Sequence, residues 1–122
     1  MINQYRRGWA LRNIREAKAD LEAAKKTSYM APSLIVEAIK KAKAAVYYSL
    51  GEPKIVEKVV NEIARKNYVF DEPFLKILLD IEETINKIIQ LQDVDREKAI
   101  KHAEYLIKTA IEIVEILTGT NF

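Results

Sequence analysis

The sequence contains no cysteine, and it has only three glycines and three prolines in 122 residues. Without cysteine the chain cannot form a disulfide, use a thiolate nucleophile or bind zinc through sulfur, and this absence fits a reducing compartment. The glycines stand far apart, at Gly8, Gly51 and Gly119. No glycine-rich loop is therefore available to hold a phosphate group.

Long hydrophobic runs are absent as well. No stretch of about 18 or more uncharged apolar residues occurs, which argues against a membrane-spanning segment. The opening residues become charged at Arg6 and lack the apolar stretch of a signal peptide. We therefore expect a cytoplasmic protein without membrane contact.

What the sequence does contain is helical periodicity, with 49% hydrophobic and 31% charged residues. Apolar residues recur at steps of three and four in five stretches. The first two cover about residues 2–26 and 32–50, the third and fourth begin at residues 53 and 73, and the last ends at about residue 117. Prolines and glycines separate these stretches, and Asp71, Asp93 and Asp95 are candidate helix caps. The most apolar stripe, in the fourth stretch, consists of Phe74, Leu78, Ile81, Ile85 and Ile88. The pattern predicts one all-α domain over residues 1–122, an up-and-down bundle of about five helices.

The charge is unevenly distributed along the chain. Residues 1–66 carry 14 Lys and Arg against 7 Asp and Glu, whereas residues 67–122 carry 6 against 11. One interpretation is that oppositely charged helices attract each other within one fold or between two subunits. The other is a basic face that meets phosphate or an acidic partner.

The run "DREKAIKHAEYL", residues 95–106, holds the only histidine of the chain, His102, six positions after Arg96. Such a pair can form half of a metal-independent ribonuclease site, with histidine as general base and arginine stabilising the phosphate charge. On a helix, however, six positions leave an offset of about 120°, so the two side chains do not lie side by side. We interpret His102 as a surface residue. A single histidine cannot supply the two needed by a di-iron bundle, and we expect no metal and no cofactor.

Near the N-terminus, Tyr5, Trp9 and Arg12 fall within about 60° of each other and about 100° or more from the apolar stripe of their helix. Arginine and aromatic side chains can bind single-stranded nucleic acid, and they are equally enriched in protein interfaces. Glu16 and Asp20 continue the same sector and would repel phosphate. We therefore favour a protein interface or ligand-binding role for these three residues.

The stretch "AKADLEAAKKTSYMAPSLIVEAIKKAKAAVYYSLGEP" resembles the first helical pair of HEPN domains, the nucleotide-binding helical domains of prokaryotes and higher eukaryotes. The closing run "DREKAIKHAEYLIKTAIEIVEIL" resembles the last helix of the family. The resemblance implies a helical bundle that is often dimeric. Some members partner a small nucleotidyltransferase, and others cleave RNA with an Arg-x(4–6)-His motif.

The chain departs from that catalytic motif. Arg96 and His102 have the required spacing, but Glu97 occupies the place where the family often has asparagine. The segment "IIQLQDV", where the motif would be expected, holds neither arginine nor histidine. The resemblance therefore implies a non-catalytic binding or scaffold module, a homodimer and a partner of a small nucleotidyltransferase. The alternatives are a ribonuclease using Arg96 and His102, or a nucleic-acid or nucleotide-binding protein using the basic N-terminal half.

Overall fold

A computed structural model describes residues 3–27, 29–65, 73–90 and 96–119. These residues form five helices and no strand, which confirms the predicted all-α class. The helices are α1 (Gln4–Lys26), α2 (Ala31–Leu50), α3 (Pro53–Arg65), α4 (Pro73–Gln90) and α5 (Arg96–Thr118). The predicted caps Asp71, Asp93 and Asp95 lie outside the described residues, as does the side chain of Phe74.

The helix boundaries follow from local chemistry. Asn3 caps α1, its side-chain Oδ1 accepting a hydrogen bond of 2.9 Å from the backbone N–H of Arg6. Pro32 lies in the first turn of α2, where its missing N–H costs nothing. Gly51 ends α2 with an N–H bond to the carbonyl of Tyr47. Gly119 ends α5 in the left-handed region, at φ 70°, which glycine adopts without strain.

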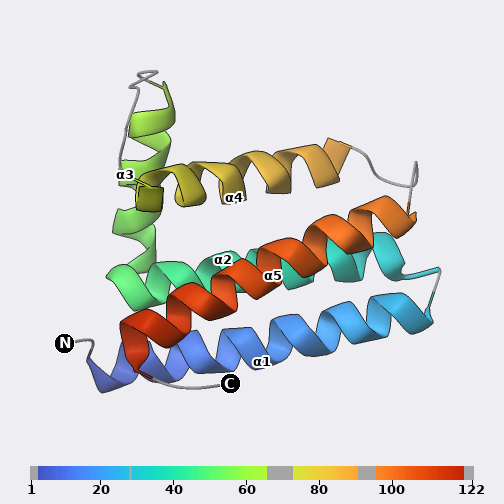
Figure 1. The fold of residues 1–122 in the computed structure, drawn as a ribbon, viewed down its shortest axis with the longest axis horizontal. Coiled ribbons are helices and arrows are strands. Elements are labelled where there is room, and N and C mark those ends of the chain that lie inside the picture. Colours follow the sequence, from blue (N-terminus) through green and yellow to red (C-terminus); the bar gives the residue numbers. More distant parts are fainter. Residues whose placement is uncertain (1–2, 28, 66–72, 91–95, 120–122) are drawn as a thin grey trace.

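Three helices, α1, α2 and α5, lie alongside one another, whereas α3 stands across them at one end and α4 returns along α5 (Figure 1). The transverse α3 departs from a simple up-and-down order. Val60 is the one residue of α3 that is buried, and Ile55 and Val59 remain 64% and 48% exposed. Because α3 buries so little surface, it does not pack lengthwise against the other helices.

Small and large apolar side chains share the core. Fully buried alanines occur on α1, α2 and α5: Ala10, Ala17, Ala24, Ala31, Ala38, Ala42, Ala45, Ala103 and Ala110. Their small side chains let neighbouring helix backbones approach closely. Leu78, Ile81, Ile85 and Ile88 of α4 complete the core as the sequence predicted. No helix in the described part of the chain has both the length and the apolar character needed to cross a membrane.

Candidate functional site

The aromatic residues singled out in the sequence do come together, and a fourth residue joins them. Trp9 stacks on Tyr48 of α2, with ring centroids 6.1 Å apart and planes inclined by 17°. Tyr5 meets Trp9 edge-on at 6.3 Å, and the Arg12 guanidinium carbon lies 5.0 Å from the centre of the Trp9 ring. We call Tyr5, Trp9, Arg12 and Tyr48 the aromatic cluster. It lies on the seam between α1 and α2.

The members of the aromatic cluster differ in exposure. Trp9 and Tyr48 are half-buried, and their stacking fixes the indole against α2. Tyr5 is 68% exposed, and 61% of the Arg12 side chain is exposed. The seam therefore presents a rigid indole flanked by an accessible phenol and an accessible cation. The sequence did not single out Tyr48, whose role is visible only once α2 packs on α1.

Acidic residues continue the seam beyond the aromatic cluster. Arg12 Nε donates to Glu16 at 3.2 Å, and Lys41 Nζ donates to Asp20 at 2.7 Å and lies 4.0 Å from Glu16. The hydrogen bond to Asp20 raises the pKa of Lys41, so the ammonium stays charged. The predicted acidic continuation is thus present: Asp20 pairs with Lys41 of α2, whereas Glu16 pairs most closely with Arg12 of its own helix.

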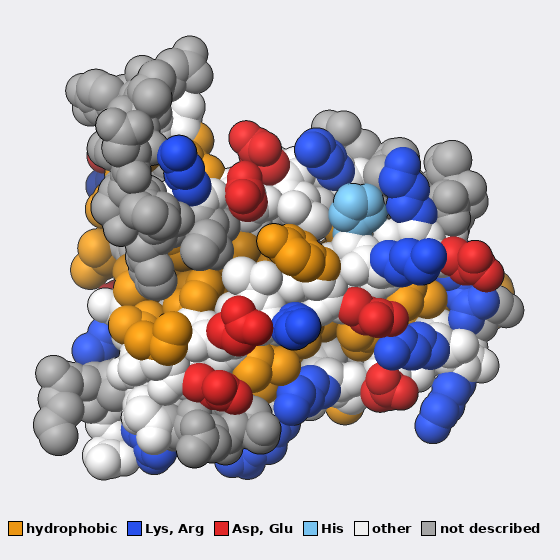
Figure 2. Space-filling model, in the orientation of Figure 1, with side chains coloured by type: hydrophobic (Ala, Val, Ile, Leu, Met, Phe, Trp, Pro, Cys, Tyr) orange, Lys and Arg blue, Asp and Glu red, His pale blue; other side chains and the backbone are white. Residues whose placement is uncertain are grey.

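Arg96 and His102 are not brought together. Arg96 donates to the backbone carbonyls of Ala24 and Lys25 at 3.1 and 2.8 Å, which caps the C-terminal end of α1. His102 lies about two turns further along α5 on its exposed side, and the histidine is visible at the surface in Figure 2. The two side chains therefore do not lie side by side, as the helical offset predicted. The Arg96 guanidinium instead binds the end of α1.

A polar cluster that the sequence did not reveal ties α2 to α3 and α4. Tyr47, 1% exposed, donates its hydroxyl to Glu82 at 2.6 Å, and burial together with this carboxylate raises the pKa of Tyr47. Lys43 Nζ lies 3.4 Å from Glu82 and 3.6 Å from Glu57. The Glu82 carboxylate thus pairs with two side chains of α2. Tyr47 and Glu82 are 35 residues apart, and Lys43 lies still further from Glu82 along the chain, so no local pattern reveals these two contacts.

Some of the basic residues of the first half pair with acidic residues of the second half within the fold. Lys25 of α1 lies 3.3 Å from Glu104 of α5 and 3.1 Å from Glu22, and hydrogen bonds to both raise its pKa. Lys43 joins the basic α2 to Glu82 of the acidic half. These pairs support attraction between oppositely charged helices within one fold.

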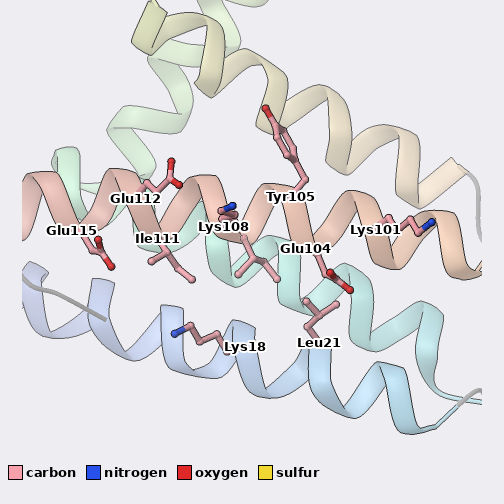
Figure 3. Close-up of a pocket in the computed structure, with 10 residues that line it drawn as sticks. Lys18, Leu21, Lys101, Glu104, Tyr105, Lys108, Ile111, Glu112 and Glu115 are labelled. Carbon is pink, nitrogen blue, oxygen red and sulfur yellow. The ribbon is translucent and has the colours of Figure 1, made fainter.

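The outer surface is hollowed beside α5. An open groove between α1 and α5 has Leu21, Ile107 and Ile111 at its base and charged side chains along its edges (Figure 3). A smaller hollow lies between α4 and α5, next to Thr84 and Thr109. Tyr105 borders both of them.

Neither the groove nor the aromatic cluster has the composition of a metal site. Among the residues that the structure describes, no group of three or more His, Asp or Glu side chains could hold a metal ion. The chain matches no protein-family model, no curated protein and no solved structure. The HEPN resemblance therefore stays a prediction, and function has to be argued from the surfaces just described.

Proposed function

We propose that the chain is a non-catalytic, HEPN-like binding or scaffold module of the cytoplasm, which acts as a homodimer and as the partner of a small nucleotidyltransferase. The aromatic cluster carries the proposal. Its residue types, tyrosine, tryptophan and arginine, are those that most often anchor protein interfaces. The stacking of Trp9 on Tyr48 holds the anchor in place before a partner arrives, so little conformational entropy is lost on binding.

The position of Arg96 supports the non-catalytic part of the proposal. Ribonuclease chemistry of this kind needs a guanidinium and an imidazole at the same phosphate. Here the guanidinium binds the end of α1, and His102 stands about 9 Å further along the axis of α5 and about 120° around it. These contacts support a structural role for Arg96 at the end of α1.

The pairing of the lysines favours a protein partner over nucleic acid. Lys25, Lys41 and Lys43 each lie within 4.0 Å of at least one carboxylate. A phosphate backbone would have to compete with these carboxylates for each cation. The basic N-terminal half therefore offers fewer cations to a nucleic acid than its composition suggests.

Purification of the tagged chain from its native host tests the proposal. We expect the wild-type chain to retain a small nucleotidyltransferase at stoichiometric level, with or without nuclease treatment. Tyr5→Ala removes an exposed ring, and Trp9→Ala removes the anchor itself and should weaken the complex by about 2 kcal/mol or more. Tyr29→Ala is the matched control, because Tyr29 is also an exposed tyrosine, at 94%, but lies in the turn after the opposite end of α1.

The outcomes separate the candidate functions. Loss of the nucleotidyltransferase in Tyr5→Ala and Trp9→Ala, with retention in Tyr29→Ala, supports the proposal. Equal retention of the nucleotidyltransferase by all variants would show that the aromatic cluster is not part of the interface. Recovery of RNA alone, lost on nuclease treatment, would contradict the proposal and favour the nucleic-acid-binding alternative.

A further inference from the structure

The outer face of α5 carries four exposed side chains in one line. They are Lys101, Tyr105, Lys108 and Glu112, which we call the α5 stripe. At 100° per residue the four directions fall within about 60° of each other, opposite the buried face of α5. The stripe runs along α5 in Figure 3, with Lys101 at one end and Glu112 at the other. Tyr105, near its middle, is 74% exposed.

The charges of the stripe are ordered along the helix. Lys101 and Glu112 are eleven residues apart, which places them about 16 Å apart along the axis and within about 20° of the same direction. Neither side chain forms a hydrogen bond or ion pair with another described residue. A cation and an anion thus stand at opposite ends of one exposed line, each available to a partner.

We propose that the α5 stripe docks antiparallel on the α5 stripe of a second copy of this chain. Reversing the direction of the helix places Lys101 opposite Glu112 of the second copy, and Glu112 opposite its Lys101. The same operation places Tyr105 beside Lys108 of the second copy, where the ammonium can lie on the phenol ring. A parallel arrangement would instead set like charges against each other.

The occupant is a second copy because the stripe is complementary to itself. A two-fold interface requires that whenever residue i contacts residue j, residue j also contacts residue i. The order Lys, Tyr, Lys, Glu meets this condition when read backwards, with a center between Tyr105 and Lys108. Tyr105 borders a hollow on either side and is 74% exposed, so its ring gains contact area on docking.

Docking at the α5 stripe leaves the aromatic cluster open. Lys18, on the edge of the groove beside α5, follows Trp9 by nine residues, which is about 180° around α1. Trp9 faces α2 and Lys18 faces α5, so the two surfaces lie on opposite sides of α1. The inference rests on the proposed function: the stripe supplies the homodimer, and the aromatic cluster remains free for the nucleotidyltransferase.

The expected dimer is weak and depends on salt. A stripe about 16 Å long covers less than the roughly 800 Å² per partner of a standard interface. Its contacts are exposed ion pairs, each of modest strength and screened at high ionic strength. We expect self-association that is clear at low salt and much reduced at high salt.

Sedimentation equilibrium of charge-reversed variants tests the inference. Lys101→Glu alone, or Glu112→Lys alone, places like charges at both ends of the docked stripes and should raise the dimer dissociation constant about tenfold or more. In a 1:1 mixture of the two variants every facing pair is again of opposite sign, so the mixture should associate as the wild type does. Lys40→Glu, the same charge change at an exposed position of α2, is the matched control and should behave as the wild type.

Each result bears on a different claim. A dimer whose strength is unchanged in both single variants would overturn the α5 interface and leave the proposed homodimer intact. Weak single variants that do not associate with each other in the mixture would overturn the antiparallel pairing. A wild-type chain that stays monomeric at low salt would overturn the homodimer of the proposed function and this inference together, while retention of a nucleotidyltransferase would still test the aromatic cluster separately.

Discussion

Two parts of this molecule are held together in different ways. The three-helix core, α1, α2 and α5, combines fully buried alanines, such as Ala42, with large buried side chains, such as Ile14 and Ile39. The α3–α4 arm has no buried alanine among its described residues and is attached by large aliphatic side chains of α4 and by the hydrogen bond from Tyr47 to Glu82. The alanine contacts of the core leave little room for extra volume, whereas the arm depends on a few side chains that each bury much surface.

This difference has a consequence for function. The aromatic cluster lies on α1 and α2, and the α5 stripe lies on α5, so both proposed binding surfaces belong to the three-helix core. Side chains on well-packed helices are held in a more precise geometry than those on loosely attached elements. The α3–α4 arm covers one side of the core and supplies none of the side chains of the aromatic cluster or of the α5 stripe.

The largest expected effect comes from removing an aliphatic anchor of the arm. Ile81 is 2% exposed, and Ile81→Ala should lower the free energy of unfolding by about 2–5 kcal/mol through lost burial and a residual cavity. Chemical denaturation measures the change. A loss below about 1 kcal/mol would show that the arm contributes little buried surface.

The alanine positions of the three-helix core should respond to added volume. Ala42 is completely buried, and Ala42→Leu should cost about 1–3 kcal/mol because α2 must move away from its neighbours. Ala19→Leu is the control: Ala19 is an exposed alanine of α1, and leucine is well tolerated on a helix surface. Equal stability of the two variants would contradict close packing at the alanines.

A smaller effect is expected from removing the hydrogen bond between Tyr47 and Glu82, which joins the arm to α2. Tyr47→Phe removes the hydroxyl that donates to Glu82 and should cost about 1.5 kcal/mol, near the lower end for a bond to a charged group because Lys43 still pairs with Glu82. Thermal unfolding at neutral pH measures it.

The same variant should also change the response to alkaline pH. Burial and the bond to Glu82 raise the pKa of Tyr47 above its ordinary 10.0, so the unfolded chain loses this proton at a lower pH than the folded chain. The contribution of Tyr47 to stability is therefore complete below pH 10.0 and is lost as the pH rises above it. Tyr47→Phe should lose less stability over that range, and parallel pH profiles for the two chains would argue against a buried phenol.

The smallest effect is expected at the histidine. His102 is exposed, and no hydrogen bond or ion pair joins it to a described residue, so His102→Ala should change stability by no more than about 0.5 kcal/mol. Any metal-independent cleavage of RNA by the wild-type chain should persist unchanged in this variant. Cleavage that disappears in His102→Ala would support the ribonuclease alternative.

Much of the fold could be read from the sequence because helix boundaries are decided locally. Pro32, Gly51 and Gly119 mark starts and ends whose chemistry lies within a few residues. The transverse position of α3 could not be read, since the apolar side chains of α3 predict a buried face but give no direction for its packing. Of these, Ile55 and Val59 stay exposed.

The candidate sites show the same division. Tyr5, Trp9 and Arg12 share one helix, so their proximity follows from helical geometry, as does the alignment of the α5 stripe. Tyr48 entered the aromatic cluster from another helix, and Arg96 reached the end of α1 across more than 70 positions of sequence. Contacts of that kind depend on how the helices pack, which periodicity alone does not determine.

Light scattering of the wild-type chain at low salt, from micromolar to millimolar concentration, measures whether the chain self-associates. We expect a mass that rises with concentration from 14.0 kDa toward twice that value, and that falls back when salt is added. A mass that remains at 14.0 kDa throughout would contradict a homodimeric binding module.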